Sequence, residues 1–183
     1  MKQAFVFLAT GVEETEAVGT IDVLRRGGIN VTIVSINDSK LVTGANNITL
    51  QADCLLAEAD YSEADALVLP GGLPGSTNLN DCVALKELLL DQYRANKIVA
   101  AICAAPLVLG GLGLLKGRKA TCYPGCEPKL IGATCTGNNT ETDGNVITGK
   151  GPAFAFHFGL ALVSALRSEA VAEELAAGLL LAN

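Results

Sequence analysis

Cys103 is the first candidate for a nucleophile in this sequence. It ends the apolar stretch 98–102 and is followed by Ala104, Ala105 and Pro106. A nucleophile on a sharp turn between a strand and a helix needs small neighbours, because the backbone bends tightly there. The amino end of a helix starting at Pro106 would favour the thiolate over the thiol. A buried structural cysteine is the alternative interpretation, since free cysteine is among the most buried residue types.

A cysteine nucleophile normally works with a base, and histidine is the usual one. The single histidine, His157, lies between Phe156 and Phe158 in a segment of helical pattern, which favours a packing role and argues against a Cys-His hydrolase. The remaining candidate is Glu16, in the first turn of the helix that follows the first strand. Burial there would raise the pKa of its carboxyl, which could then hold a proton and hydrogen-bond the thiolate.

Two further acids and a pair of glycines lie near these candidates. Glu13 and Glu14 are expected to be solvated acids at the start of the same helix. Gly71 and Gly72 follow a buried strand, where main-chain N–H groups can face a ligand and hold an oxyanion without obstruction by side chains. An ordinary turn is the alternative. The glycine spacing matches no dinucleotide or phosphate-binding motif, so no nucleotide or other cofactor is predicted.

The other cysteines carry no recognisable metal motif. Cys122, Cys126 and Cys135 lack the paired C-x-x-C spacing and a second histidine, so no metal site is predicted. The remaining two are Cys54 and Cys82. Six cysteines scattered through a chain without a secretory signal indicate reduced thiols and a cytoplasmic location.

The composition indicates one folded domain, residues 1–183. Half of the residues are hydrophobic and 17% are charged, which suits a large core. The net charge of -6 and the absence of Lys/Arg clusters argue against a nucleic-acid partner. The apolar runs are too short to span a membrane, so no membrane partner is expected.

Buried strands alternate with helices along most of the chain, which predicts an α/β fold with a parallel sheet. Strands are expected at 4–8, 31–35, 66–69, 98–102, 119–122 and 146–148. Helices are expected from 13 to 26, 81 to 93, 106 to 112, 153 to 166 and 168 to 181. The segment 37–56 is expected to form a small antiparallel excursion. Because parallel strands gather ligand-binding residues at their carboxyl ends, Cys103 and the glycine turn should share one edge.

Four motifs in this order resemble the ThiJ/PfpI superfamily, in particular the branch of the human Parkinson-disease protein. They are Gly11–Glu16, Pro70–Gly72, Ala100–Pro106 and Gly149–Pro152. The resemblance covers essentially the whole chain. It implies a flavodoxin-like, doubly wound α/β sandwich with a mostly parallel sheet and helices on both faces. It also implies a homodimer.

The same resemblance assigns roles to individual residues. It implies a nucleophile elbow at Cys103, a protonated glutamate at Glu16 and an oxyanion site from the main chain of Gly72 and Ala104. Two positions depart from the family pattern. Tyr123 stands where the branch has a histidine, which makes it a possible auxiliary residue and predicts a slow enzyme. Ala104 stands where protease-like members have a histidine, which argues against a peptidase.

Two classes of function follow for Cys103. The first is a cofactor-free glyoxalase or deglycase that acts on a small aldehyde or a glycated protein in carbonyl or oxidative stress. The second is a redox-sensing chaperone, whose cysteine is oxidised without turnover. A role associated with thiamine-thiazole biosynthesis is a further alternative that the resemblance implies.

The surface of the first helix bears on assembly. Val12, Thr15, Gly19 and Thr20 are small or apolar on the side expected to face away from the sheet, and residues 179–181 are leucines. Because both surfaces need cover, we expect a two-fold homodimer with this helix near the interface.

Overall fold

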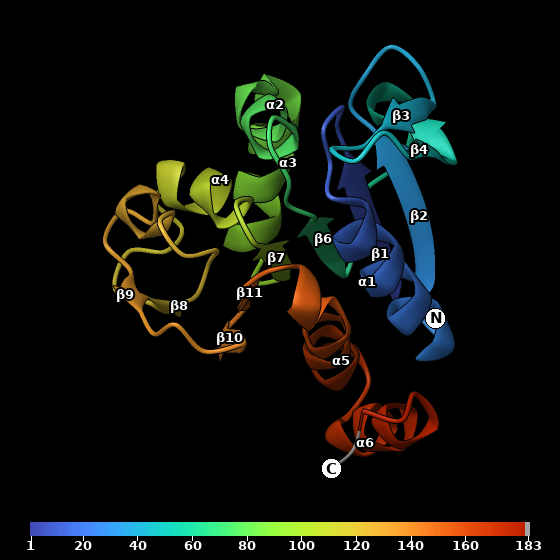
Figure 1. The fold of residues 1–183 in the computed structure, drawn as a ribbon, viewed down its shortest axis with the longest axis vertical. Coiled ribbons are helices and arrows are strands. Elements are labelled where there is room, and N and C mark those ends of the chain that lie inside the picture. The colour runs from blue at the N-terminus through green and yellow to red at the C-terminus, as the bar shows by residue number, and fades with distance from the viewer. Residues whose placement is uncertain (182–183) are drawn as a thin grey trace.

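A seven-stranded sheet forms the centre of the computed structural model, which describes residues 1–181 (Figure 1). Its strands, in spatial order, are β10 (Thr140–Asp143), β11 (Val146–Gly149), β7 (Ile98–Ile102), β6 (Ala66–Leu69), β1 (Gln3–Leu8), β2 (Asn30–Ser35) and β5 (Cys54–Leu55). All neighbours pair in parallel except β10 and β11. The α/β architecture with a mostly parallel sheet is therefore confirmed.

Helices cover both faces of this sheet. They are α1 (Glu14–Arg26), α2 (Gly75–Asp81), α3 (Val83–Arg94), α4 (Pro106–Gly111), α5 (Ala155–Leu166) and α6 (Glu169–Gly178). Because successive strand residues point to opposite faces, Val6 and Val68 pack in the layer of α1 and α5, whereas Phe7 and Leu67 pack in the layer of α2, α3 and α4. The side chains of all four are at most 1% exposed, so the sheet is buried on both sides.

The strand order brings the candidate residues together. Strands β7, β6 and β1 are neighbours, and their parallel direction makes their carboxyl ends open on one edge. Cys103 follows β7, Gly71 lies just after β6, and the turn after β1 leads into α1 with Glu16. This edge is where open α/β sheets bind ligands.

The segment between β2 and β6 contains the predicted antiparallel excursion. Strands β3 (Leu41–Thr43) and β4 (Thr49–Gln51) pair only with each other. The sequence analysis missed β5, a two-residue strand that extends the main sheet beside β2. Its short length gives no recognisable apolar alternation.

Several predicted boundaries were wrong for local reasons. Asp81 ends α2 instead of starting a helix, because Cys82 has an extended backbone that separates α2 from α3. The strand expected at 119–122 is limited to β8 (Lys119–Ala120), which pairs with β9 (Thr134–Cys135), since the next N–H, of Thr121, bonds the Thr148 hydroxyl. Pro152 begins a 3-10 turn, η3 (Pro152–Phe154), and α5 follows it.

Part of the surface assigned to a subunit interface is covered within the chain. A Cβ on Gly19 would lie 3.3 Å from the Cβ of Ala155 in α5, and Thr20 is fully buried. Val12 is also buried, with 1% of its surface exposed. Placing Val12, Gly19 and Thr20 at an interface was therefore wrong, because Val12 packs in the core and α5 packs along α1. Thr15 remains exposed on α1, and Leu180, just beyond the end of α6, is 88% exposed. No helix in the described part of the chain is long and apolar enough to cross a membrane.

Candidate active site

Cys103 occupies a strained elbow between β7 and α4. Its φ of +65° lies in the left-handed region that non-glycine residues seldom adopt. The backbone is held on both sides: the Cys103 N–H donates to the Gly149 carbonyl (2.9 Å), and the Tyr123 N–H donates to the Cys103 carbonyl (2.8 Å). Pro106 is the first residue of α4, as predicted. The side chain is 7% exposed, so it is nearly but not completely closed to solvent.

Glu16 projects from the first turn of α1 toward this elbow. Glu13 caps the helix by accepting the Glu16 N–H at 2.7 Å, which fixes where that turn begins. The Glu16 carboxyl is fully buried, and its Oε2 accepts the Gly71 N–H at 2.8 Å. Among the described residues, no N–H or O–H group donates to Oε1. A buried carboxyl oxygen without a donor is costly as an anion, which favours the protonated acid.

Gly71 and Gly72 make room for this pair. A Cβ on Gly71 would lie 2.6 Å from both the Cys103 Cβ and the Glu16 Oε2. Gly72 has a φ of +92°, and a Cβ there would overlap the backbone of the turn before α1. Only glycine allows the strand end to pass this close to Cys103 and Glu16. The main chain of Gly72 and of Ala104 acts to lower the pKa of the Cys103 thiol, against the larger effect of burial.

Burial controls the proton affinities of the pair. It raises the pKa of Glu16 to about 7, although hydrogen bonds with Cys103 and Gly71 favour the anion. Burial, followed by the charge of an ionised Glu16, also raises the pKa of Cys103. The expectation that the helix amino end would lower the thiol pKa was therefore wrong, because burial outweighs the six-residue helix α4. A protonated Glu16 removes the charge repulsion and leaves the thiolate with N–H and O–H donors.

The other candidate residues from the sequence are Tyr123 and His157. The main-chain N–H of Tyr123 is hydrogen-bonded to the Cys103 carbonyl, and the Tyr123 side chain is 50% exposed. His157 is exposed on α5, where its ring contacts Phe154. Within residues 1–181, no three His, Cys, Asp or Glu side chains are placed to hold a metal ion.

Glu14 has a structural position that the sequence analysis missed. It is 5% exposed instead of solvated, and it accepts the Asn46 N–H at 2.8 Å, the Asn46 side-chain amide at 3.0 Å and the Ile48 N–H at 3.2 Å. These bonds tie the β3–β4 turn to the start of α1. Nothing in the sequence indicated that this turn would meet Glu14.

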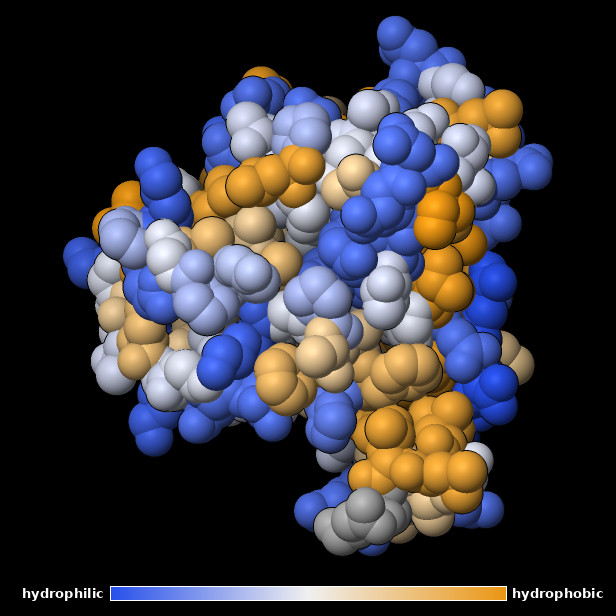
Figure 2. Space-filling model, in the orientation of Figure 1, coloured by the Kyte–Doolittle hydropathy of each residue, from blue (hydrophilic) through white to orange (hydrophobic). Residues whose placement is uncertain are grey.

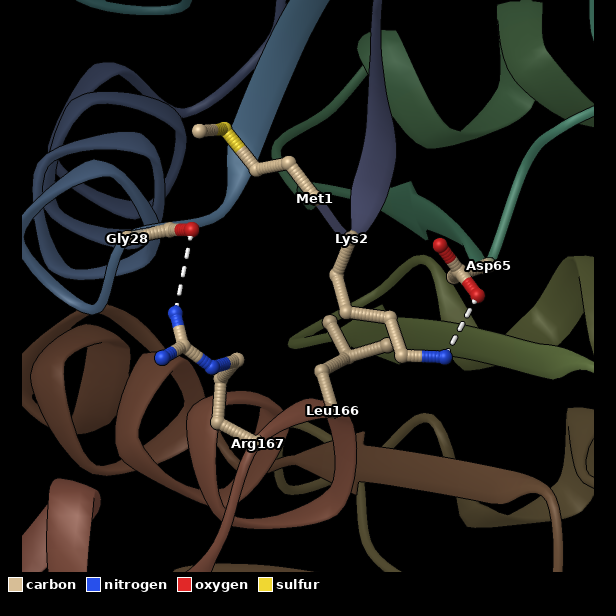
Figure 3. Close-up of a pocket in the computed structure, with 6 residues that line it drawn as sticks. All are labelled: Met1, Lys2, Gly28, Asp65, Leu166 and Arg167. Carbon is tan, nitrogen blue, oxygen red and sulfur yellow. Dashed lines mark hydrogen bonds and ion pairs between the residues drawn. The ribbon is translucent and has the colours of Figure 1, made fainter.

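A cavity of about 610 Å³ lies at the amino-terminal edge of the sheet, opposite the edge that carries Cys103 (Figure 3). Its polar groups already have partners. The Lys2 ammonium pairs with Asp65 at 2.8 Å, and the Arg167 guanidinium donates to the Gly27 and Gly28 carbonyls at 3.1 and 3.2 Å. The volume of a cavity alone therefore does not identify the candidate active site.

Comparisons with known proteins agree with this geometry. The model of the DJ-1/PfpI family matches residues 2–165. The chain belongs to the DJ-1/PfpI family. Protein dj-1beta of Drosophila melanogaster is 37% identical over 183 residues, covering 99% of this chain and 98% of the fly protein. Protein DJ-1 homolog B of Arabidopsis thaliana is 40% identical over 182 residues, but the match spans only 42% of that longer protein.

Solved DJ-1 structures share the whole fold. An oxidised DJ-1 of Toxoplasma gondii superposes with a TM-score of 0.96 at 33% identity and covers 100% of both chains. DJ-1beta of Drosophila melanogaster gives a TM-score of 0.93 at 37% identity over 100% of this chain and 99% of its own. Membership in the DJ-1/PfpI family, and in its DJ-1 branch, is thus supported by sequence and by structure.

Proposed function

We propose that this protein is a cysteine-dependent, cofactor-free enzyme that acts on small α-oxoaldehydes or on their adducts with proteins. The observation that carries the proposal is the fully buried Glu16 carboxyl beside Cys103, with one oxygen that receives no N–H or O–H bond from any residue the structure describes. A carboxyl with a pKa near neutrality can both give and take a proton, as glyoxalase chemistry requires.

In the first step, the Cys103 thiolate attacks the aldehyde carbon of the substrate. A C–S bond forms, and the carbonyl electron pair moves to the oxygen. We expect the Gly72 and Ala104 N–H groups to stabilise this developing oxyanion by hydrogen bonding. Glu16 gives its proton to that oxygen, so the product of the step is a neutral hemithioacetal and a carboxylate.

In the second step, the Glu16 carboxylate removes the proton from the former aldehyde carbon and returns it to the neighbouring carbon, while the hydroxyl proton passes to the ketone oxygen. The hemithioacetal thereby becomes a 2-hydroxy thioester. Water then cleaves the C–S bond and releases the hydroxy acid as its anion; one proton returns to Glu16, one leaves to the solvent, and Cys103 is again a thiolate. For methylglyoxal, the balanced sum is methylglyoxal plus water giving lactate and a proton.

Tyr123 sets an expectation for the rate of this reaction. It stands where the related branch has a histidine, and its phenol is a poor base at neutral pH. Glu16 must therefore perform both proton transfers, and we expect slow turnover.

The direct test is lactate formation from methylglyoxal. We expect the parent protein and a Cys82→Ser control to form lactate, and Cys103→Ser to form none above background. If the parent forms no more lactate than Cys103→Ser, the proposal is wrong.

Redox sensing by Cys103 is a second candidate, because the similar Toxoplasma gondii protein has been solved in an oxidised form. A peroxide would convert the thiolate to a sulfenate and water, and a second peroxide would give the sulfinate and water. Glu16 can donate a hydrogen bond to the sulfinate. Peptide mass spectrometry after mild peroxide should place the first oxidation on Cys103; equal oxidation of all six cysteines would contradict this role.

The proposal includes a homodimer in the cytoplasm. An apolar patch covers much of α6 and the residues after it in Figure 2, at the lower right. Leu180, just beyond α6, is 88% exposed, and Val18 on α1 is 50% exposed. A second copy of the chain would cover these side chains. All six cysteines are free thiols, which suits a reducing compartment.

A further inference from the structure

A mostly apolar cavity of about 240 Å³ lies next to the elbow, between the loop after β8 and the turn η3. Its walls include two aromatic rings and two prolines. The prolines have no main-chain N–H that could bind water. The residues are Tyr123 and Pro124 on one side, and Pro152 and Phe154 on the other, with Gly151 and Lys150 between them. Ligand sites are commonly lined in this way by apolar and aromatic groups.

Both walls of the cavity are joined to Cys103 through the backbone. Tyr123 donates its N–H to the Cys103 carbonyl at 2.8 Å, and the Cys103 N–H donates to Gly149, whose successor Lys150 lines the cavity. The turn η3 also packs against α1, the helix that carries Glu16. The cavity is therefore adjacent to the thiol and the acid, although neither side chain lines it.

The volume of the cavity is sufficient for an aromatic ring. An apolar protein cavity of about 150 Å³ holds benzene, so a volume of about 240 Å³ leaves space for a ring and a short chain. The Tyr123 ring packs against Gly151, where a Cβ would lie 3.2 Å from ring atom Cδ2. Lys150 is held by the Gly137 carbonyl at 3.0 Å. A methyl group would leave most of this space unfilled.

We propose that this cavity binds the substituent of the substrate and that the enzyme prefers aryl α-oxoaldehydes to methylglyoxal. The inference rests on the proposed function and adds the substrate class to it. With phenylglyoxal, the aldehyde carbon bonds to Cys103 while the ring lies between Tyr123 and Phe154. The balanced reaction is phenylglyoxal plus water giving mandelate and a proton, through the steps given above for methylglyoxal.

The test compares kcat/KM for phenylglyoxal and methylglyoxal by measuring mandelate and lactate. We expect the parent to favour phenylglyoxal about tenfold or more, and Phe154→Ala to lower this ratio about tenfold. Phe156→Ala removes an aromatic ring that packs on the core and should keep the parent ratio. Gly151→Ala narrows the cavity against Tyr123 and should also lower the ratio.

The outcomes separate this inference from the proposed function. If methylglyoxal is turned over but the ratio is near one, or does not change in Phe154→Ala and Gly151→Ala, the cavity inference is wrong and the proposed function stands. If no aldehyde is turned over, binding of mandelate and lactate to Cys103→Ser decides. Tighter binding of mandelate that weakens in the added Phe154→Ala background supports the aryl site, and equal binding overturns it.

Discussion

Each of the two sheet edges has a partly or fully buried carboxyl group beside a cavity, but the pKa values of the two groups are shifted in opposite directions. At the amino-terminal edge, Asp65 accepts the Lys2 ammonium and the Gln3 N–H, both at 2.8 Å, and its pKa is lowered by these bonds despite some burial. At the carboxyl edge, Glu16 has one N–H donor, no exposed surface and a raised pKa. The unsatisfied buried oxygen of Glu16, more than cavity volume, thus distinguishes the carboxyl edge, where we propose that the chemistry occurs.

The largest expected effect is on turnover. Glu16→Gln removes the group that gives and takes protons, so lactate formation from methylglyoxal should fall about 100-fold or more. Asp65→Asn makes the matched change at the other edge and should alter turnover less than about twofold. Steady-state kinetics of both variants test the contrast. A similar loss of turnover in both variants would show that the two carboxylates affect turnover only by stabilising the fold.

The two carboxyls should also have opposite effects on stability as the pH changes. For Glu16, the folded pKa of about 7 exceeds the ordinary carboxyl value of 4.5, so its contribution is fully present below pH 4.5 and is lost as the pH rises to about 7. The loss is about 3 kcal/mol if the shift is fully expressed. For Asp65, the lowered pKa contributes stability above about pH 4 that is lost on acidification.

Urea unfolding of Glu16→Gln and Asp65→Asn between pH 4.5 and 8 measures these differences. The first variant should gain stability relative to the parent as the pH rises, and the second should be less stable than the parent at pH 7. Parallel curves for the parent and Glu16→Gln would contradict a raised pKa at Glu16.

A smaller effect on stability and turnover is expected at Gly71, just after the end of β6. Gly71→Ala would force a Cβ to within 2.6 Å of Cys103 and Glu16, which should cost about 1–3 kcal/mol of stability and also reduce turnover. Gly178→Ala is the control, because no atom lies within 4 Å of a Cβ built there. Thermal unfolding compares the two. A Gly71→Ala protein with parental stability and turnover would mean that the strand end can move away.

The smallest effect concerns the β3–β4 turn. Glu14→Gln keeps an oxygen for the Asn46 and Ile48 N–H groups but turns an amide donor toward the Asn46 side chain, so we expect a loss of about 1 kcal/mol. Adding Asn46→Asp restores a donor–acceptor pair and should recover part of the stability in urea unfolding. No recovery in the double variant would show that this side-chain pair contributes little.

Much of the fold could be predicted because it depends on local patterns. Continuous apolar runs identified the central strands, and Cys103, Glu16 and Gly71 met because they follow three strands that prove to be neighbours. The burial of Glu14, the pairing of β8 with β9 and the cover of Gly19 by α5 depend on contacts between distant segments. The direction of the Cys103 pKa also escaped prediction, because burial, unlike a helix terminus, has no sequence signature.

The central claim is that burial raises the pKa of both Glu16 and Cys103, so that an ionised Glu16 opposes the neighbouring thiolate. The ultraviolet absorbance of the thiolate, taken as the parent spectrum minus that of Cys103→Ser and titrated from pH 5 to 11, tests it most directly. We predict that the Cys103 thiolate signal of the parent appears only above the ordinary cysteine pKa of 9.0, and that it moves to lower pH in Glu16→Gln, which carries no charge beside the sulfur. A parent with a full thiolate signal at pH 7, or identical titrations of the two proteins, would contradict the account.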